Sequence, residues 1–510
     1  AVIALVLVVT VAAFILPSLT AVPTEVPIVQ VEPVAAGQYM VLVAQLERLT
    51  GDEREHARFV IDNLRQTLEV DAAFSRLAVR EYPQVITSQQ AARTAADANN
   101  AAIVIWGNYS GDLVELNIDV GSTAPFPLLT LPRESIEQVA NVRLQLTNVR
   151  QQSIVPQVLV VMTALLSAEG NTYEVARNIS VIEQLDVSGV EVTGNSAAAR
   201  YHRAVDVFFS DAAEALAELN AAINLNATNP LLYALRTLVQ LRLGNFAAVA
   251  ADAQTAERLG PEDWALPSFS LATNAMFFEQ DLPSALEYTS EIVTRRPDDW
   301  FAYTFRAAVY YEMGDYESAR ADVERAIELG PGANFPYSLA ASIAMHQDRI
   351  EDARALAARA LSEFPDPTEG NRSVSAVFGS SLPVIEMSVA FANMALGQFD
   401  SALQNVQSVI DSGDATADVY LVQGLAYCNQ REYEQAEEAY SNGIELDPDF
   451  WLLYLLRAEV RRYNNDFLGA LRDVSTVQDS EAGAAYEELI AQALQGESGL
   501  DCESFFNAPL

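Results

Sequence analysis

The chain has 510 residues, half of them apolar, and a formal net charge of -39 at pH 7. It contains no lysine, so all 30 basic residues are arginine. A chain of this length needs several domains or a repeat array, and its apolar content excludes a disordered acidic chain. The negative surface disfavours nucleic acid and anionic lipid headgroups, so we expect no nucleic-acid partner.

Several kinds of catalysis lack the residues that they need. Without lysine there can be no P-loop lysine and no Schiff-base lysine. His56, His202 and His346 lie in separate segments without paired-ligand spacing, and two cysteines alone cannot hold zinc. We therefore expect no cofactor, no metal and no enzyme activity. A carboxylate-based enzyme stays open as an alternative, because 69 acidic residues guarantee chance pairs.

Residues 1–21 are predicted to be a transmembrane anchor. They begin with the uncharged run AVIALVLVVTVAAFIL, which as a helix would reach about 24 Å, somewhat short of a hydrocarbon core of ~30 Å that the following residues would complete. A secretory signal peptide and a buried core helix are the alternatives. No arginine precedes Arg48, so the anchor lacks the basic flank of a cytoplasmic side. We expect the bulk of the chain outside the cytoplasm, in the periplasm or at the cell surface.

Residues 22–37 are rich in proline and are predicted to be a semi-rigid extended linker. Residues 38–121 are predicted to form a small α/β domain, with strands at 39–46, 77–82, 103–106 and 113–120 and helices at 53–68 and 88–99. This order predicts parallel pairing plus one antiparallel strand. Residues 122–156 are expected to be a connector followed by a linking helix over Arg133–Arg150.

The run from Ser88 to Val120 resembles the closing half of a TolB amino-terminal-type domain. An alanine-rich helix leads into a strand that ends at Gly107, Asn108 and Tyr109, and a hairpin follows. The resemblance covers about residues 38–121 and implies a module for protein contact or assembly, not an active site. Nucleotide binding is an alternative, but no glycine-rich turn follows Leu46.

Two consecutive segments between Asp298 and Pro365 repeat one pattern. The positions that recur 34 residues apart are Tyr303 and Tyr337, Ala307 and Ala341, Ala319 and Ala353, Ala326 and Ala360, and Pro331 and Pro365. This pattern resembles the tetratricopeptide repeat. Each unit is predicted to be a pair of amphipathic helices, and because one pair cannot bury its apolar face alone, successive units must stack into a superhelix.

The repeat register predicts a mainly α fold, an α-solenoid of about nine helical hairpins over residues 157–480. Ala402, Ala436 and Ala470 keep the 34-residue spacing, but 49 residues separate Ala353 from Ala402. Residues 366–382 are therefore predicted to be an insertion. Residues 481–510 are expected to hold a capping helix and a carboxy-terminal tail.

The resemblance implies a protein-binding groove lined by fixed positions on the first helix of each unit. Those positions here are mostly aromatic, methionine or polar: Asn274, Phe277, Phe278, Phe301, Tyr311, Glu312, Met345, His346, Phe391, Met394, Asn429, Arg462 and Tyr463. One subgroup of the family grips a terminal carboxylate with lysines, which this chain lacks. We expect the groove to receive an apolar segment or helix instead. The alternative is that the aromatic residues pack between units.

Cys428 and Cys502 are predicted to form a disulfide bond. Two cysteines in an oxidising compartment are expected to pair, and the tail around Cys502 has the reach to fold back over the last units. A buried thiol at Cys428 and an unstructured tail are the alternative.

These patterns predict a membrane-tethered extracytoplasmic scaffold. Its partners are expected to be other protein subunits, themselves membrane-associated, within a larger membrane or cell-surface assembly. The alternative is the ligand-sensing extracytoplasmic portion of a receptor.

Overall fold

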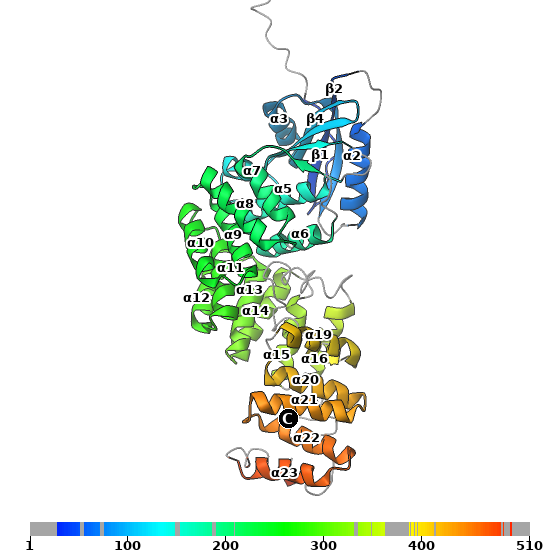
Figure 1. The fold of residues 1–510 in the computed structure, drawn as a ribbon, viewed down its shortest axis with the longest axis vertical. Coiled ribbons are helices and arrows are strands. Elements are labelled where there is room, and N and C mark those ends of the chain that lie inside the picture. Colours follow the sequence, from blue (N-terminus) through cyan, green and yellow to red (C-terminus); the bar gives the residue numbers. More distant parts are fainter. Residues whose placement is uncertain are drawn as a thin grey trace, which may run out of the picture.

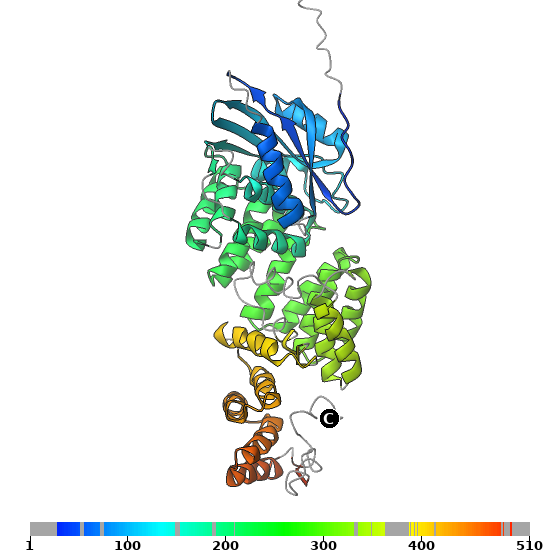
Figure 2. The same cartoon turned by 90° about the vertical axis from the view of Figure 1, so that its right-hand side faces the viewer.

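The computed structural model describes residues 28–362 and 387–480, with residues 483, 490 and 491. Within these ranges it omits 51–55, 72–75, 148–152, 186–189, 209, 331–334, 348, 388, 392, 395 and 413–414. The predicted anchor (1–21), the insertion (366–382), most of the capping helix and the tail therefore lie outside the described residues. Figures 1 and 2 show an elongated molecule, with a β-sheet at one end and helical hairpins extending away from it.

The described strands form one mixed sheet in the order β3-β1-β4-β5-β6-β7. Their bounds are β1 Tyr39–Gln45, β2 Glu47–Arg48, β3 Leu77–Val85, β4 Ala101–Ser110, β5 Leu113–Val120, β6 Val142–Leu146 and β7 Glu191–Val192. β1 pairs in parallel with β3 and β4, and β2 is also parallel to β4. From β4 to β7 every pairing is antiparallel. The predicted parallel strands and the antiparallel hairpin are confirmed.

Helices cover both faces of the sheet. α2 (His56–Arg65), followed by a π-helical segment (Gln66–Asp71), packs on one face together with α5 (Val155–Glu169). α3 (Gln89–Asn99) covers the other face, and its Ser88 cap accepts a hydrogen bond from the Ala91 amide at 3.3 Å.

The sheet is larger than the sequence pattern indicated. A helix was predicted throughout Arg133–Arg150, but α4 ends at Ala140 and β6 begins at Val142. In β6 the apolar side chains alternate with polar ones, which is a strand pattern. β7 follows only after the next helical hairpin, so the sheet domain extends beyond residue 121.

The described end of the proline-rich segment lies against the sheet domain. The Val31 amide donates to Asn99 Oδ1 at 2.8 Å, and Asn99 Nδ2 donates to the Val29 carbonyl at 3.0 Å. Arg80 Nε donates to the Glu32 carbonyl at 3.1 Å. From Ile28 onward the expected spacer is therefore bound along the α3 face rather than free of the domain.

Paired helices follow the sheet, as the 34-residue period predicts. Their bounds are α6 Thr172–Gln184, α7 Ala197–Asp206, α8 Ala212–Leu225, α9 Pro230–Arg242, α10 Phe246–Leu259, α11 Leu266–Thr273, α12 Leu282–Arg295, α13 Trp300–Glu312, α14 Tyr316–Leu329, α15 Phe335–His346, α16 Ile350–Ser362, α19 Phe399–Ser412, α20 Ala417–Asn429, α21 Tyr433–Leu446, α22 Trp451–Tyr463 and α23 Phe467–Gln478. α11 continues into a π-helical turn at Asn274–Phe278.

Aspartate residues set where many of the second helices begin. Asp211, Asp281, Asp315 and Asp466 each accept a hydrogen bond from the backbone amide three residues later, at 2.8–3.2 Å. A side-chain acceptor at this position satisfies an amide that has no partner within the helix. The recurring aspartate therefore fixes the turn in these four hairpins.

The apolar residues form two large cores. The first runs from the strands through the hairpins as far as α15, and the second begins at Met387 and includes α19–α23. The sheet and the first hairpins thus share one continuous core. The predicted boundary between the sheet domain and the solenoid has no matching break in packing.

Candidate functional site: a groove cluster between two helical stacks

The first hairpin, α5–α6, contacts helices far along the chain. Trp264 Nε1 donates to the Ser167 carbonyl at 2.7 Å. The Tyr173 ring packs edge-on against Trp300 at 4.7 Å and lies 5.6 Å from the Phe301 ring, between centroids. The chain's own hairpin therefore covers the position where a partner was expected to contact Phe301.

Four predicted groove residues are buried in the core. Asn274, Phe301, Phe391 and Met394 are each at most 9% exposed. The expectation that they line an open groove is corrected for these residues, because the α5–α6 hairpin and the neighbouring repeats cover them. The side chains of Phe278 and Met345 lie outside the described part of the structure.

Four of the other predicted groove residues do not come together, because Phe277, Asn429 and the adjacent Arg462 and Tyr463 lie on three different helical elements. Phe277 packs 6.4 Å from the Phe305 ring. Asn429 Nδ2 donates to the Leu425 carbonyl of its own helix at 2.8 Å. Arg462 pairs with Glu459 at 3.1 Å, and the exposed Tyr463 ring stacks on Tyr433 at 4.6 Å.

The remaining three predicted residues, Tyr311, Glu312 and His346, meet in one place. We call it the groove cluster, and it also contains the buried Phe391 and two residues that were not predicted, Tyr316 and Asp418. Tyr311 and Glu312 end α13, Tyr316 begins α14, and His346 ends α15. Phe391 precedes α19, and Asp418 lies in the first turn of α20. The cluster therefore joins the last hairpins of the first core to the first hairpins of the second.

His346 is the centre of the cluster. Its Nε2 lies 2.8 Å from the Tyr311 hydroxyl, its ring stacks on Tyr316 at 4.9 Å, and Phe391 approaches edge-on at 5.9 Å. Burial lowers the pKa of His346, partly offset by Asp418, and raises the pKa of Tyr311 well above its usual value. The neutral imidazole therefore accepts a hydrogen bond from the Tyr311 hydroxyl at Nε2 and carries its own proton at Nδ1.

Two carboxyl groups face this aromatic group. Burial, and then the charge of Asp418, raise the pKa of Glu312 to about 7. Burial also raises the pKa of Asp418, and His346 opposes that shift. Glu312 and His346 are nevertheless reached by water. Asp418 is exposed as well, and the mutual charge repulsion of Glu312 and Asp418 favours a bound cation.

Sequence reasoning missed Tyr316 and Asp418. Tyr316 does carry a signal, since aromatic residues recur at the start of the second helix, as at Phe399, Tyr433 and Phe467. Asp418 carries none, because one acidic residue in a helical first turn is common. Among the described residues, no group of three or more histidine, cysteine or acidic side chains could hold a metal ion.

Cys428 lies on α20 in the second core, where it is 2% exposed. It takes part in a disulfide bond. Its expected partner, Cys502, lies outside the described residues, so the pairing of these two residues stays a prediction.

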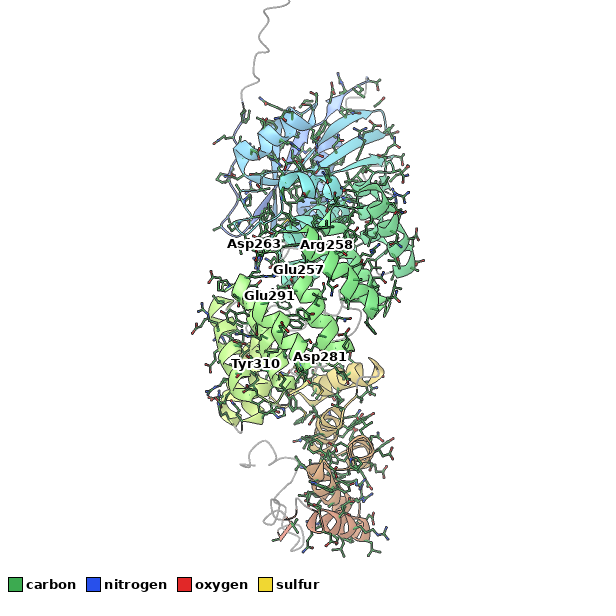
Figure 3. The ribbon with its side chains drawn as sticks, turned by 90° about the vertical axis from the view of Figure 1, so that its left-hand side faces the viewer. Glu257, Arg258, Asp263, Asp281, Glu291 and Tyr310 are labelled. Carbon is green, nitrogen blue, oxygen red and sulfur yellow. The ribbon has the colours of Figure 1, made fainter. Side chains whose placement is uncertain are left out.

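Acidic residues also line one side of the first stack. Figure 3 shows Glu257 on α10, Asp263 in the turn that follows it, Asp281 at the cap of α12 and Glu291 on α12. Arg295 lies 2.6 Å from Glu291 and 3.4 Å from Glu257, and so offsets part of this charge. Burial, followed by nearby carboxylates, raises the pKa of Tyr288 on the same helix as Glu291. This side would repel an anionic surface.

Comparison with known proteins identifies the repeats. Residues 300–333 and 417–450 match family models described as tetratricopeptide repeat. Hsp70-Hsp90 organizing protein 3 of Arabidopsis thaliana is 40% identical over 65 residues, which are 13% of this chain and 12% of that protein. DnaJ protein P58IPK homolog B of Oryza sativa subsp. japonica is 24% identical over 199 residues, 38% of this chain and 41% of the relative.

The chain is also similar, at lower identity, to solved structures. The APC/C hetero-tetramer Cut9-Hcn1 is 15% identical, with a TM-score of 0.41, over 68% of this chain and 64% of that chain. PilW, a type IV pilus biogenesis factor, is 15% identical, with a TM-score of 0.30, over 45% of this chain and 98% of that chain. The family-model matches confirm tetratricopeptide repeats at residues 300–333 and 417–450. The chain spans less than half the length of the Arabidopsis thaliana and Oryza sativa relatives.

Proposed function

We propose that this tetratricopeptide-repeat chain is a membrane-tethered extracytoplasmic scaffold, and that its groove cluster binds a segment of another, membrane-associated subunit. The observation that carries the proposal is that two exposed carboxyl groups with raised pKa values, Glu312 and Asp418, lie beside the rings around His346. Such a surface favours an apolar segment that carries an arginine or lysine, since the cation can lie between the carboxylates and against the rings.

A partner's carboxylate terminus suits this cluster poorly. The names of the Arabidopsis and wheat relatives state that they organise Hsp70 and Hsp90, and those names describe those proteins. In this chain the cluster presents Glu312 and Asp418 and no lysine, so a terminal carboxylate would meet like charge.

Charge removal tests the groove. We expect Glu312→Gln with Asp418→Asn to lose co-purification of a stoichiometric partner from detergent-solubilised membranes. The matched control is Glu324→Gln with Glu328→Gln, which removes the same charge from exposed sites on α14 and should leave the complex intact. Equal partner recovery from both double variants would place the contact elsewhere.

The affinity of the complex should depend on pH through Glu312. Because a cation binds the ionised carboxylate, and the pKa of Glu312 is raised to about 7, affinity should be full above this pH and fall as the pH drops through it. The expected loss between pH 8 and pH 6 is about tenfold. Binding by the purified partner is measured by calorimetry across this range, and the Glu312→Gln variant should show a flat profile.

The amino-terminal segment supports the membrane part of the proposal. Its first 16 residues are uncharged, and no arginine occurs before Arg48. In the described part of the chain, no helix combines the length and apolarity that crossing a membrane requires, and residues 1–27 lie outside that part.

We expect the chain to fractionate with membranes and a version lacking residues 1–36 to be soluble. Protease added to intact cells or spheroplasts should digest the repeats. Repeats that stay protected until the cells are lysed would contradict the extracytoplasmic location.

A further inference from the structure

The sheet face that α3 covers becomes polar in the part of the sheet that α3 leaves uncovered. On this face β1 and β4 contribute Met40, Leu42 and Val104 to an apolar cluster with the alanines of α3. Further across the sheet, β4, β5 and β6 contribute Trp106, Asn117, Asp119 and Arg143. Strand pairing places Trp106 opposite Asn117, and Asn117 opposite Arg143. α3 and α7 lie on this side of the sheet (Figure 1).

A pocket of about 410 Å³ opens here. It is lined by Trp106, Asn117, Asp119, Asn141 and Arg143, with Gln89 from the start of α3 and Thr193 and Ser196 from the segment before α7. Its volume is at the lower end of the range for small-molecule sites. The pocket lies in the sheet domain, on elements separate from those of the groove cluster.

The deepest polar groups of the pocket are held in place by the protein. Asp119 is 5% exposed, and its Oδ2 accepts the Trp106 indole hydrogen at 2.7 Å. Asn141 Oδ1 accepts from the Val120 amide at 2.7 Å, while its Nδ2 is buried with no hydrogen-bond partner. A buried donor left unpaired costs about 1–3 kcal/mol. An acceptor atom on a ligand would recover that loss.

The charges of the pocket point to a neutral ligand. Arg143 lies at the exposed rim, where its Nε donates to Asn117 Oδ1 at 3.2 Å. Desolvation raises the pKa of Asp119 to about 6, against the hydrogen bond from Trp106 and the charges of Arg93 and Arg133. The charge of Glu137, with which Arg93 and Arg133 pair, adds to the rise. An anionic ligand would meet Asp119, and a cationic ligand would meet Arg143 at the rim.

We propose that this pocket binds an uncharged polyhydroxylated molecule of the size of one or two sugar rings. A sugar hydroxyl donates a hydrogen bond to Asp119 and accepts one from Asn141, because one neutral hydroxyl is both a donor and an acceptor. The amides of Gln89 and Asn117 extend the same pattern, and the Trp106 ring offers an apolar surface to the C–H face of the sugar. This inference goes beyond the scaffold function and does not depend on it.

Titration of the full chain with sugars tests the site. The probes are glucose, galactose, mannose, N-acetylglucosamine and maltose, each followed by tryptophan fluorescence and saturation-transfer NMR up to about 10 mM, well above a dissociation constant of ~1 mM. At least one sugar should bind. Asp119→Asn, which keeps an oxygen to accept the Trp106 hydrogen bond, should lower the affinity for that sugar at least tenfold. Trp106→Phe should abolish the fluorescence change.

Asp112→Asn, in the exposed turn between β4 and β5, is the matched control and should bind the sugar as the unaltered chain does. Circular dichroism checks that each variant is folded; if Asp119→Asn is not, Asn117→Ala should weaken binding in its place. The proposal is overturned if none of the sugars binds, if glycine, glutamate or arginine binds instead, or if a bound sugar is unaffected by the pocket variants.

Discussion

Arginine–aspartate pairs join the two helices of several hairpins at one sequence spacing. Arg236 with Asp252, Arg306 with Asp322, and Arg457 with Asp473 are each 16 residues apart and each form two hydrogen bonds of 2.5–3.0 Å. All three aspartates are buried. A planar guanidinium can satisfy both carboxylate oxygens at once, whereas a lysine offers a point charge. The arginine-only composition therefore has a structural use.

We predict that Arg306→Lys loosens its hairpin. One of the two hydrogen bonds to the buried Asp322 would be lost, at a cost of about 1–3 kcal/mol. Arg320→Lys is the control, because Arg320 pairs with the exposed Glu317 and such pairs contribute at most about 1 kcal/mol. Hydrogen exchange of the α13 and α14 amides should speed up in Arg306→Lys only. Identical exchange in the two variants would contradict this role of the pair.

At the scale of elements, the α5–α6 hairpin connects the sheet to the later repeats. It lies between β6 and β7 in the chain, and every residue of α5 is buried. Gly170 ends α5 with φ of 75°, a conformation that favours glycine, and an added Cβ would lie 3.1 Å from the Arg296 side chain. Trp264, just before α11, then joins α11 to α5 by a hydrogen bond to the Ser167 carbonyl. The hairpin is thus part of the sheet domain and also the surface on which α11 and α13 pack.

Trp264→Phe should weaken this contact. The buried Ser167 carbonyl would lose the indole donor and keep only the Gly170 amide. The lost hydrogen bond costs about 1 kcal/mol, and amides in α5, α6 and α11 should exchange faster with solvent. Trp451→Phe is the control, since Trp451 is partly exposed at the start of α22 in the second core. Faster exchange confined to α11, with α5 and α6 unchanged, would show that the tryptophan stabilises only its own helix.

At the scale of the whole molecule, the cores divide the chain into two stacks. The first includes the sheet and the hairpins through α15, and the second includes α19–α23 (Figure 2). The groove cluster lies where they meet, since Tyr311 and His346 belong to the first stack and Asp418 to the second. A partner bound there would contact both stacks at once, which suits a scaffold whose two halves must be held in one arrangement.

The disulfide predicted between Cys428 and Cys502 belongs to the same scale. Closing a loop of 74 residues, the difference between 502 and 428, stabilises the folded chain by about 4 kcal/mol in the chain-entropy description. Mass spectrometry of a non-reduced digest should find the two peptides joined. Cys502→Ser should lower the denaturant midpoint of the second stack, whereas a reductant should have no further effect on that variant. Two separate peptides with free thiols would refute the pairing.

The sequence by itself determined the repeated hairpins, the strands β1, β3, β4 and β5 with their parallel and antiparallel pairing, and many of the helix starts. These features follow from local rules: apolar periodicity, capping aspartates and proline or glycine at turns act within one or two helical turns. Tyr311, Glu312 and His346 could be predicted from the sequence for the same reason, because their repeat positions place them at the ends of successive first helices.

Only the tertiary structure decided which of those positions remain open to a partner. Phe301 and Tyr311 occupy first-helix positions of one unit, yet Tyr173, more than 120 residues earlier, packs against Phe301, while His346 and Asp418 meet Tyr311. β6 was misassigned as helix because a five-residue strand gains its stability from pairing with β5, not from its own pattern. No local pattern marks Asn117 and Asp119 of β5 as pocket residues, because the pocket also needs β6, the start of α7 and the segment before it. Contacts between residues distant in sequence are fixed by packing, which no local pattern records.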